Sequence, residues 1–244
     1  MFLKAIEQTV AEFEVAEPVE APKHPGNPND TTMTDPFQLE EYLEAHATAP
    51  DAVLQELYRH TYLHEMNPRM MSGPVQGKFL QFLCQMLKPR RVLEIGTYTG
   101  YAAICIARGL PEGGMLVTIE ANKEYEDTLR HYFDKAQVSE QIDLIIGDAK
   151  TVIPTLSKPF DLVFIDADKV SYPTYYNMVM EKVHPGSFIL ADNVLWDGKV
   201  LNAQTKEHDT QALIAFNDIV QNDSRVENVL LPIRDGLMMI RVAD

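Results

Sequence analysis

The sequence has few cysteines and no long hydrophobic run. Only two cysteines occur in 244 residues, Cys84 and Cys105. This scarcity excludes a disulfide-stapled fold and favours a reducing compartment. No apolar run approaches the ~18 residues that a membrane-spanning helix needs, and the first residues are too acidic for a secretory signal. We therefore expect a cytoplasmic protein with no membrane partner.

Positive charge is also scarce. Lys plus Arg number 21 against 36 Asp plus Glu, which gives a formal net charge of −15. Such a protein repels nucleic acids and anionic membranes unless its basic residues cluster. The densest basic group is small, namely Lys88, Arg90 and Arg91. The composition is otherwise that of an ordinary globular protein, with 45% hydrophobic residues.

The first 32 residues differ from the rest of the chain. They hold six acidic residues, two basic residues and four prolines. Such a segment buries little apolar surface, although the spacing within Leu3–Phe13 permits a short helix. We predict a loose appendage over 1–32, followed by a single domain over 33–244.

Helical spacing of apolar residues begins at Phe37. It predicts one helix before Pro50, one capped by Asp51, and one from about Pro74 to Lys88. Strands and helices alternate after Pro89. The predicted strands are 91–95, 115–120, 142–146, 161–166 and 187–192. The predicted helices are 102–110, one that begins after Asn122, 172–183 and 211–220. A predicted hairpin joins 226–233 to 237–242. This order predicts an α/β fold with a mostly parallel sheet, helices on both faces and one antiparallel strand.

Two glycines follow the first predicted strand. In open α/β sheets, ligands bind at the carboxyl ends of the strands. The first strand ends with Glu94 before Gly96 and Gly100, a G-x-x-x-G spacing unlike the dinucleotide fingerprint. The acid would repel a pyrophosphate but attract an ammonium group, and Glu120 ends the second strand, where a carboxylate often binds ribose hydroxyls. The pattern favours a nucleoside with a cationic amino-acid tail, such as S-adenosylmethionine. The alternative is that the glycines only form a turn.

Oxygen-bearing side chains follow two later strands. Asp166 and Asp168 come after the fourth strand, and Asp192 and Asn193 after the fifth. Asp166, Asp192 and Asn193 suit Mg²⁺ or another divalent cation such as Mn²⁺ or Ca²⁺, and no His or Cys accompanies them, which argues against zinc. A lysine near a bound cation gives up its proton more readily, so Lys169, with Asp166, is predicted to be catalytic. The alternatives are strand-end caps and a surface lysine.

Other candidates carry weaker signals. His60 and His64 lie four residues apart and would form half of a metal site, but no third ligand is apparent. Trp196 would either line a substrate pocket or pack in the core. Tyr175 and Tyr176 suit a core or an interface better than a catalytic role.

Three motifs in this order resemble the cation-dependent O-methyltransferases of the caffeoyl-CoA and catechol type. They are Val92–Tyr101, Phe164–Lys169 and Ala191–Gly198, and Leu231–Leu237 resembles the closing hairpin of that family. The resemblance extends from about residue 70 to residue 241. It implies a Rossmann-like, doubly wound, seven-stranded sheet of order 3-2-1-4-5-7-6, which binds S-adenosylmethionine, and a homodimer.

The resemblance also implies roles for individual residues. Asp166, Asp192 and Asn193 match the metal ligands, and Lys169 matches the proposed base. Relatives often carry a serine at Ala102, and they usually have a small residue where Arg234 stands, so the substrate contacts of the last hairpin are expected to differ here. The positions that match the methyl-donor site are Met70, Ser72, Glu94, Gly96, Gly100, Ala102, Glu120, Asp148, Ala149 and Asp166.

The predicted reaction is methyl transfer to a hydroxyl of a catechol-like small molecule. A cation that binds two adjacent hydroxyls lowers the pKa of one of them, and Lys169 takes the proton. One alternative is a methyltransferase of the same family that acts on hydroxylated uridine in transfer RNA, which the charge of −15 disfavours. Another is a non-catalytic metabolite-binding module on the same fold, which the full ligand set and the lysine disfavour.

Overall fold

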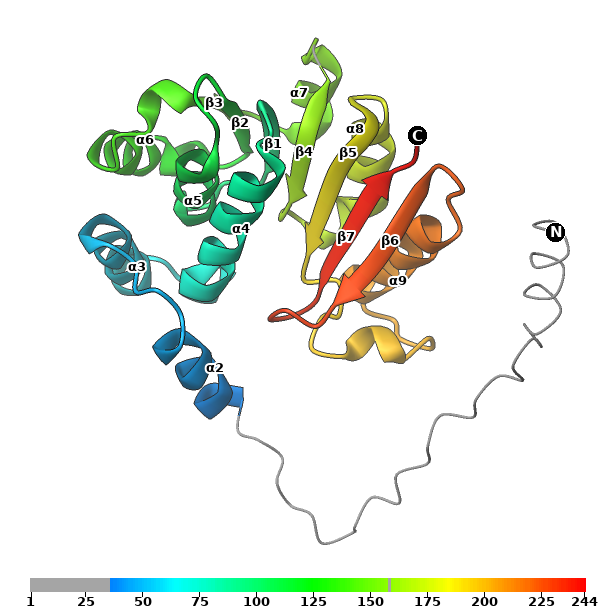
Figure 1. Ribbon diagram of the computed structural model, residues 1–244. Helices are drawn as coiled ribbons and strands as arrows, with labels where there is room; N and C mark the ends of the chain where they lie inside the picture. The colour runs from blue at the N-terminus through cyan, green and yellow to red at the C-terminus, as the bar shows by residue number, and fades with distance from the viewer. Residues whose placement is uncertain (1–35, 158) are drawn as a thin grey trace, which may run out of the picture. The chain divides into compact units, whose positions relative to one another are not determined.

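The computed structural model describes residues 36–157 and 159–244 (Figure 1). The chain divides into two units, 1–40 and 41–244. The fold described below is that of the second, except that the first described helix begins in residues 36–40. The predicted appendage over 1–32, with its possible short helix, lies outside the described residues, so its looseness stays a prediction.

Seven strands form one sheet in the described part of the chain. Their order is β3-β2-β1-β4-β5-β7-β6. β7 runs antiparallel to both of its neighbours, and the other pairs are parallel. The predicted sheet and its order are therefore confirmed. The strands are β1 (Arg91–Ile95), β2 (Met115–Glu120), β3 (Ile142–Ile146), β4 (Phe160–Ile165), β5 (Val183–Asp192), β6 (Val226–Leu231) and β7 (Leu237–Val242).

Helices cover both faces of the sheet (Figure 1). Neighbouring residues of β1 point to opposite faces: Val92 packs in the core beneath α3, α4, α5 and α6, and Leu93 in the core beneath α7, α8 and α9. Two covered faces explain the continuous apolar runs of the central strands. The helices are α2 (Pro36–Ala45), α3 (Ala52–His64), α4 (Gly73–Leu87), α5 (Tyr101–Gly109), α6 (Glu126–Lys135), α7 (Ala149–Val152), α8 (Tyr172–Met180) and α9 (His208–Gln221).

The predicted start of the second helix is confirmed. Asp51 precedes α3, and its side chain accepts a hydrogen bond from the backbone N–H of Leu54 at 3.0 Å. This bond satisfies one of the backbone donors that the first turn of a helix leaves unpaired.

The predicted boundary between α8 and β5 is wrong. We expected the helix to extend to Val183 and the strand to begin at Ser187, but α8 ends at Met180 and β5 begins at Val183. Val183 pairs with Phe160, and the register of the β4–β5 pairing then shifts before Leu162. The irregularity accommodates Pro185, which has no N–H to donate, and Gly186, whose φ is +85°. The Pro-Gly pair therefore lies in an irregular strand.

Candidate active site

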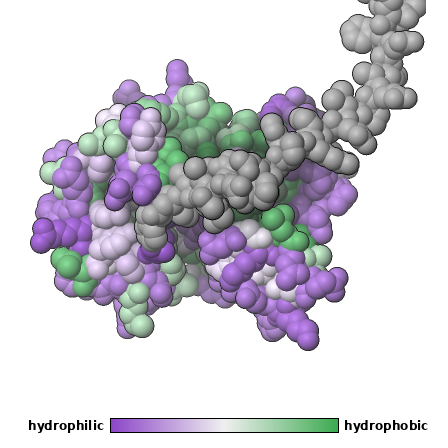
Figure 2. Space-filling model, turned by 90° about the horizontal axis from the view of Figure 1, so that it is seen from below, coloured by the Kyte–Doolittle hydropathy of each residue, from purple (hydrophilic) through white to green (hydrophobic). Residues whose placement is uncertain are grey.

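A large cavity opens at the carboxyl end of the sheet. Its volume is about 1380 Å³. Loops that follow β1 to β5, the β6–β7 turn and the segment from Tyr62 to Ser72 line it. Figure 2 views the molecule from below Figure 1, the side on which the β6–β7 turn lies, and hydrophobic surface shows there between hydrophilic margins. The cavity therefore lies where ligands bind in open α/β sheets.

Most of the residues predicted from the sequence share this cavity. Glu94, Gly100 and Asp192 do not contribute to its lining. Arg234 and Trp196, which had no settled role, both line the cavity. The predicted residues that line it are Met70, Ser72, Gly96, Ala102, Glu120, Asp148, Ala149, Asp166, Lys169 and Asn193.

The two glycines after β1 are required by packing within the protein. Gly96 has φ +93°, and a Cβ there would lie well under 3.0 Å from the backbone oxygen of Asp166. Gly100 has φ +95°, and its Cβ would lie 2.9 Å from side-chain atoms of Leu129 and Phe133 in α6. Both positions also have the left-handed backbone that glycine adopts without strain. The glycines by themselves therefore do not indicate a ligand, and Gly96 is needed to bring the ends of β1 and β4 together.

The Glu120 side chain stabilises the turn between β1 and α5 through hydrogen bonds. Its Oε2 accepts hydrogen bonds from the N–H groups of Thr97 at 3.2 Å and Tyr98 at 2.7 Å, and its Oε1 accepts one from Asn122 at 2.8 Å. Tyr98 has a left-handed φ of +52°. A carboxylate has about four acceptor positions, so Glu120 retains capacity for a ligand hydroxyl while it holds this turn.

Removing the Glu120 carboxylate is expected to loosen the turn. In Glu120→Ala, the N–H groups of Thr97 and Tyr98 lose their charged acceptor, and the free energy of unfolding should fall by about 1.5–3 kcal/mol. Urea denaturation measures this change. Glu120→Gln keeps one acceptor oxygen and should lose less, whereas an equal loss in both variants would contradict the assigned bonds.

Glu94 is a buried carboxyl beneath the cavity. It lies on the same face of β1 as Val92 and is fully buried. The hydroxyl of Thr118 donates to its Oε2, and its Oε1 has no hydrogen-bond partner among the described residues. Burial raises the pKa of Glu94 to about 8 despite the bond from Thr118, and the Asp166 and Glu120 carboxylates add to the shift. A cationic group near Glu94 would stabilise its ionised form.

Two acidic side chains meet at the adjoining ends of β4 and β5. Asp166 follows β4 and Asp192 ends β5, and the register pairs Ile165 with Ala191, the residues before them. Asp192 is only 1% exposed, and burial, followed by the nearby Asp166 carboxylate, raises its pKa. Asn193 comes next, with a left-handed φ of +60°, and lines the cavity.

This cluster has the chemistry of a cation site. Oδ1 of Asp192 is buried without a hydrogen-bond partner in the described structure. An unpaired oxygen on a buried carboxylate beside a second carboxylate fits a bound cation, which would satisfy it. Across the described ranges, no group of three or more His, Cys, Asp or Glu side chains is arranged to bind a metal, so the site would depend on the Asn193 amide. His60 and His64 stack on each other without further ligands of this kind.

Lys169 is held beside Asp166. Its Nζ lies 3.1 Å from Asp166 Oδ1 and 2.8 Å from the hydroxyl of Tyr172, to which it donates. The Tyr172 hydroxyl in turn donates to the backbone oxygen of Asp192 at 2.8 Å. The lysine is 9% exposed and lines the cavity. Its amine is thus fixed at the cluster by a tyrosine that also contacts the end of β5.

Sequence reasoning missed Tyr172 and Gln76. Tyr172 lies three residues after Lys169, a spacing that could have suggested the contact. Gln76 lies within the apolar helix α4 and is fully buried, and its contacts come from residues far along the chain. Tyr175 and Tyr176 are buried in the core as expected, although Tyr175 also reaches the cavity wall and donates to Asp168.

Sequence comparisons find one family. A profile of the O-methyltransferase family matches residues 44–243. Catechol O-methyltransferase of Niastella koreensis is 36% identical over 168 residues, which make up 67% of this chain and 76% of that protein. Catechol O-methyltransferase domain-containing protein 1 of Mus musculus is 31% identical over 206 residues, or 82% of this chain and 78% of that protein.

Two solved structures with the same fold are also O-methyltransferases. The O-methyltransferase of Bacillus cereus, in complex with SAH, has a TM-score of 0.79 and 30% identity, and the match covers 84% of this chain and 97% of that one. The O-methyltransferase TomG of Streptomyces achromogenes, in complex with SAM, has a TM-score of 0.79 and 27% identity, with 85% and 96% covered.

Proposed function

The chain belongs to the O-methyltransferase family, and on that premise we propose that it methylates one of two adjacent hydroxyls on a catechol-like small molecule. The methyl donor is S-adenosylmethionine. In this proposal a divalent cation binds Asp166, Asp192 and Asn193, and Lys169 handles the proton. The observation that carries it is the unpaired, buried Oδ1 of Asp192 near the Asp166–Lys169 pair, which lines the cavity.

The donor would occupy the part of the cavity near the turn after β1. Met70, Ser72, Gly96, Ala102, Asp148 and Ala149 line that cavity. Glu120 has acceptor capacity for ribose hydroxyls beyond its three backbone bonds. Glu94 and Gly100 would act from outside the lining, through charge and turn geometry. These assignments stay predictions.

The residues at the cluster suit proton removal and methyl transfer. When bound, the cation supplies positive charge that favours ionisation of a hydroxyl beside it. Lys169 accepts the proton at Nζ, which Asp166 and Tyr172 hold in place. Methyl transfer then forms an O–CH₃ bond as an S–CH₃ bond breaks, and the sulfonium charge is lost. Walls that exclude water favour such a charge-neutralising step, and the fixed geometry keeps the reacting atoms in line.

The transfer RNA alternative gains no support from the charges around the cavity. A polyanion would need a basic path to Lys169, but acidic side chains outnumber basic ones in the lining. The acidic set is Glu120, Asp148, Asp166, Asp168, Asp197, Asp209 and Asp235, and the basic set is Arg69, Lys150, Lys169 and Arg234. The basic group of Lys88, Arg90 and Arg91 lies at the opposite end of the sheet, where β1 begins.

A methyl-transfer assay tests the proposal. Labelled S-adenosylmethionine should methylate catechol but not resorcinol, whose hydroxyls are not adjacent. Excess chelator should lower the rate about 10²-fold, and Mg²⁺ should restore it. Full activity in excess chelator would show that methyl transfer does not require the cation. Methylation of hydroxylated transfer RNA in place of catechol would favour the alternative substrate.

Assembly and location stay predictions. The family resemblance predicts a homodimer, and the cysteine content predicts a cytoplasmic protein. In the ranges that the structure describes, no helix combines the length and apolar character needed to cross a membrane.

A further inference from the structure

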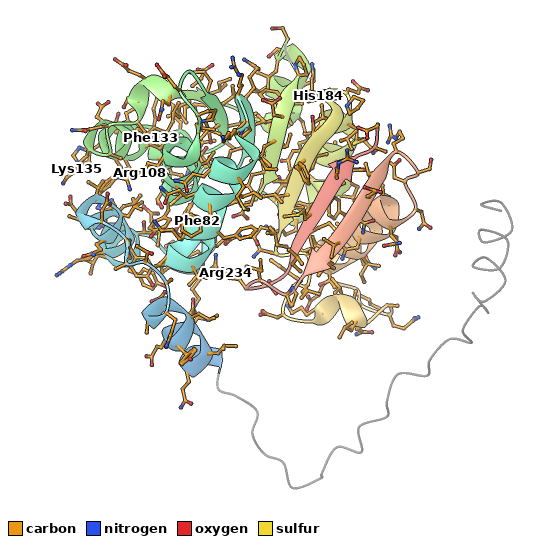
Figure 3. The ribbon with its side chains drawn as sticks, in the orientation of Figure 1. Phe82, Arg108, Phe133, Lys135, His184 and Arg234 are labelled. Atoms are coloured by element: carbon orange, nitrogen blue, oxygen red, sulfur yellow. The ribbon has the colours of Figure 1, made fainter. Side chains whose placement is uncertain are left out.

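Arg234 connects the β6–β7 turn to the start of α4. It has a left-handed φ of +49° and lies between that turn and the N-terminal end of α4 (Figure 3). Its Nη1 donates to the backbone oxygen of Ser72 at 2.6 Å and to Oε1 of Gln76 at 2.7 Å, and its Nη2 lies 3.5 Å from the backbone oxygen of Arg69. Both N–H groups of Nη1 are therefore directed at the protein, although the arginine lines the cavity.

The bond from Arg234 fixes which way the Gln76 amide points. A guanidinium group only donates hydrogen bonds, so the Gln76 atom beside it must be the oxygen. The NH₂ group of Gln76 is then on the other side, where the amide lies within reach of the Asp192 carboxyl. Without Arg234 the amide would be free to rotate and present its oxygen to the carboxylate.

Gln76 and Asp192 each keep a buried atom unpaired. Nε2 of Gln76 and Oδ1 of Asp192 are both buried and make no hydrogen bond within the described residues. A buried donor and a buried acceptor that have no partner in the protein are commonly satisfied by a bound group, such as a water. A cation at Asp192 would satisfy Oδ1, and a water bound to that cation would accept the hydrogen bond from Nε2 of Gln76.

We propose that Arg234 is a positioning residue, which orients Gln76 toward Asp192 and thereby increases the affinity of the cation site. The inference rests on the proposed function, because it requires a cation at Asp192. It assigns Arg234 a role that the resemblance did not supply, since the family usually has a small residue there. Residues that orient metal ligands typically change metal affinity by about 10–100-fold.

If Arg234 acts only through its charge, its substitution should change cation affinity differently than if it acts by orienting Gln76. A positive charge near the site repels a cation, so an effect of charge alone would make Arg234→Ala bind metal more tightly and leave Arg234→Lys unchanged. Orientation predicts weaker binding in both variants, because a lysine cannot hold the Ser72 and Gln76 oxygens with a planar fork.

The experiment is calorimetric titration of the donor-free protein with Mn²⁺. We expect Gln76→Met, which keeps the volume without the amide, to weaken binding about tenfold, and Arg234→Ala and Arg234→Lys to weaken it about three- to tenfold. The double variant Arg234→Ala/Gln76→Met should bind no more weakly than Gln76→Met alone, because the arginine acts through the glutamine. Arg241→Ala is the matched control. Arg241 lies in β7 and pairs with Glu227 and Asp244, so this variant should bind Mn²⁺ like wild type.

Three results would overturn the inference: unchanged or tighter Mn²⁺ binding in the Arg234 variants, multiplicative losses in the double variant, or an equal loss in Arg241→Ala. If Arg234→Ala does not fold, Arg234→Lys and Gln76→Met decide the question. A wild-type protein that neither binds Mn²⁺ nor methylates catechol refutes the proposed function together with this inference. A wild-type protein that does both, with variants of normal affinity, refutes the inference alone.

Discussion

Lys169→Met is expected to lower kcat by about 10²–10⁴-fold, the range for losing a positioned general base. Methionine keeps the length of the lysine but accepts no proton. The Lys169 amine contacts Asp166 and Tyr172 at the proposed cation cluster, and Lys169 is not among the residues predicted to bind the methyl donor. The Kd for S-adenosylmethionine should therefore stay within about twofold of wild type, since no donor contact is removed.

Rapid-quench kinetics and equilibrium titration with S-adenosylmethionine measure the two quantities separately. Lys199→Met is the matched control, because Lys199 carries the same charge but pairs with Glu207 outside the cavity lining. Its kcat should be that of wild type. A parallel loss of kcat and donor affinity in Lys169→Met would mean that the lysine supports the fold of the site and does not move the proton.

The cluster was predictable because its members follow strands. Asp166 and Lys169 follow β4, and Asp192 and Asn193 lie at the end of β5. The parallel pairing places the ends of those strands side by side. The apolar runs of the central strands are short and fit strands whose two faces are both buried. The start of β5 was not predictable, since Pro185 and Gly186 are typical of a loop and only pairing with Phe160 makes the segment a strand.

Long-range contacts account for what the sequence did not reveal. Gln76 and Arg234 are 158 positions apart, and nothing local distinguishes Gln76 from a polar residue on a helix surface. Arg234 was expected to alter contacts with the substrate, yet the oxygens of Ser72 and Gln76 occupy the donors of its Nη1. Gly96 was interpreted through the close approach of a ligand, which stays a prediction. The structure adds a second constraint, the backbone oxygen of Asp166 after the neighbouring strand, which only the folded sheet brings near.

That constraint makes Gly96→Ala a strongly destabilising substitution. The new Cβ would collide with the backbone oxygen of Asp166, and backbone cannot rotate away as a side chain can. The left-handed φ of +93° adds strain of about 1–2 kcal/mol. Together we expect a loss of about 3 kcal/mol or more in the free energy of unfolding. The atom that must move belongs to Asp166, so activity per folded molecule should fall as well.

Gly113→Ala is the control that separates the effect of the steric collision from the effect of backbone strain. Gly113 has a similar φ of +74°, but a Cβ there would meet no atom within 4 Å, so this variant should lose only about 1–2 kcal/mol and keep full activity. Urea denaturation gives both free energies, and assays at matched folded fractions give both activities. Equal losses of stability would show that Gly96 is required for its φ alone. The difference between the two free energies measures the cost of the collision between the new Cβ and the backbone of Asp166.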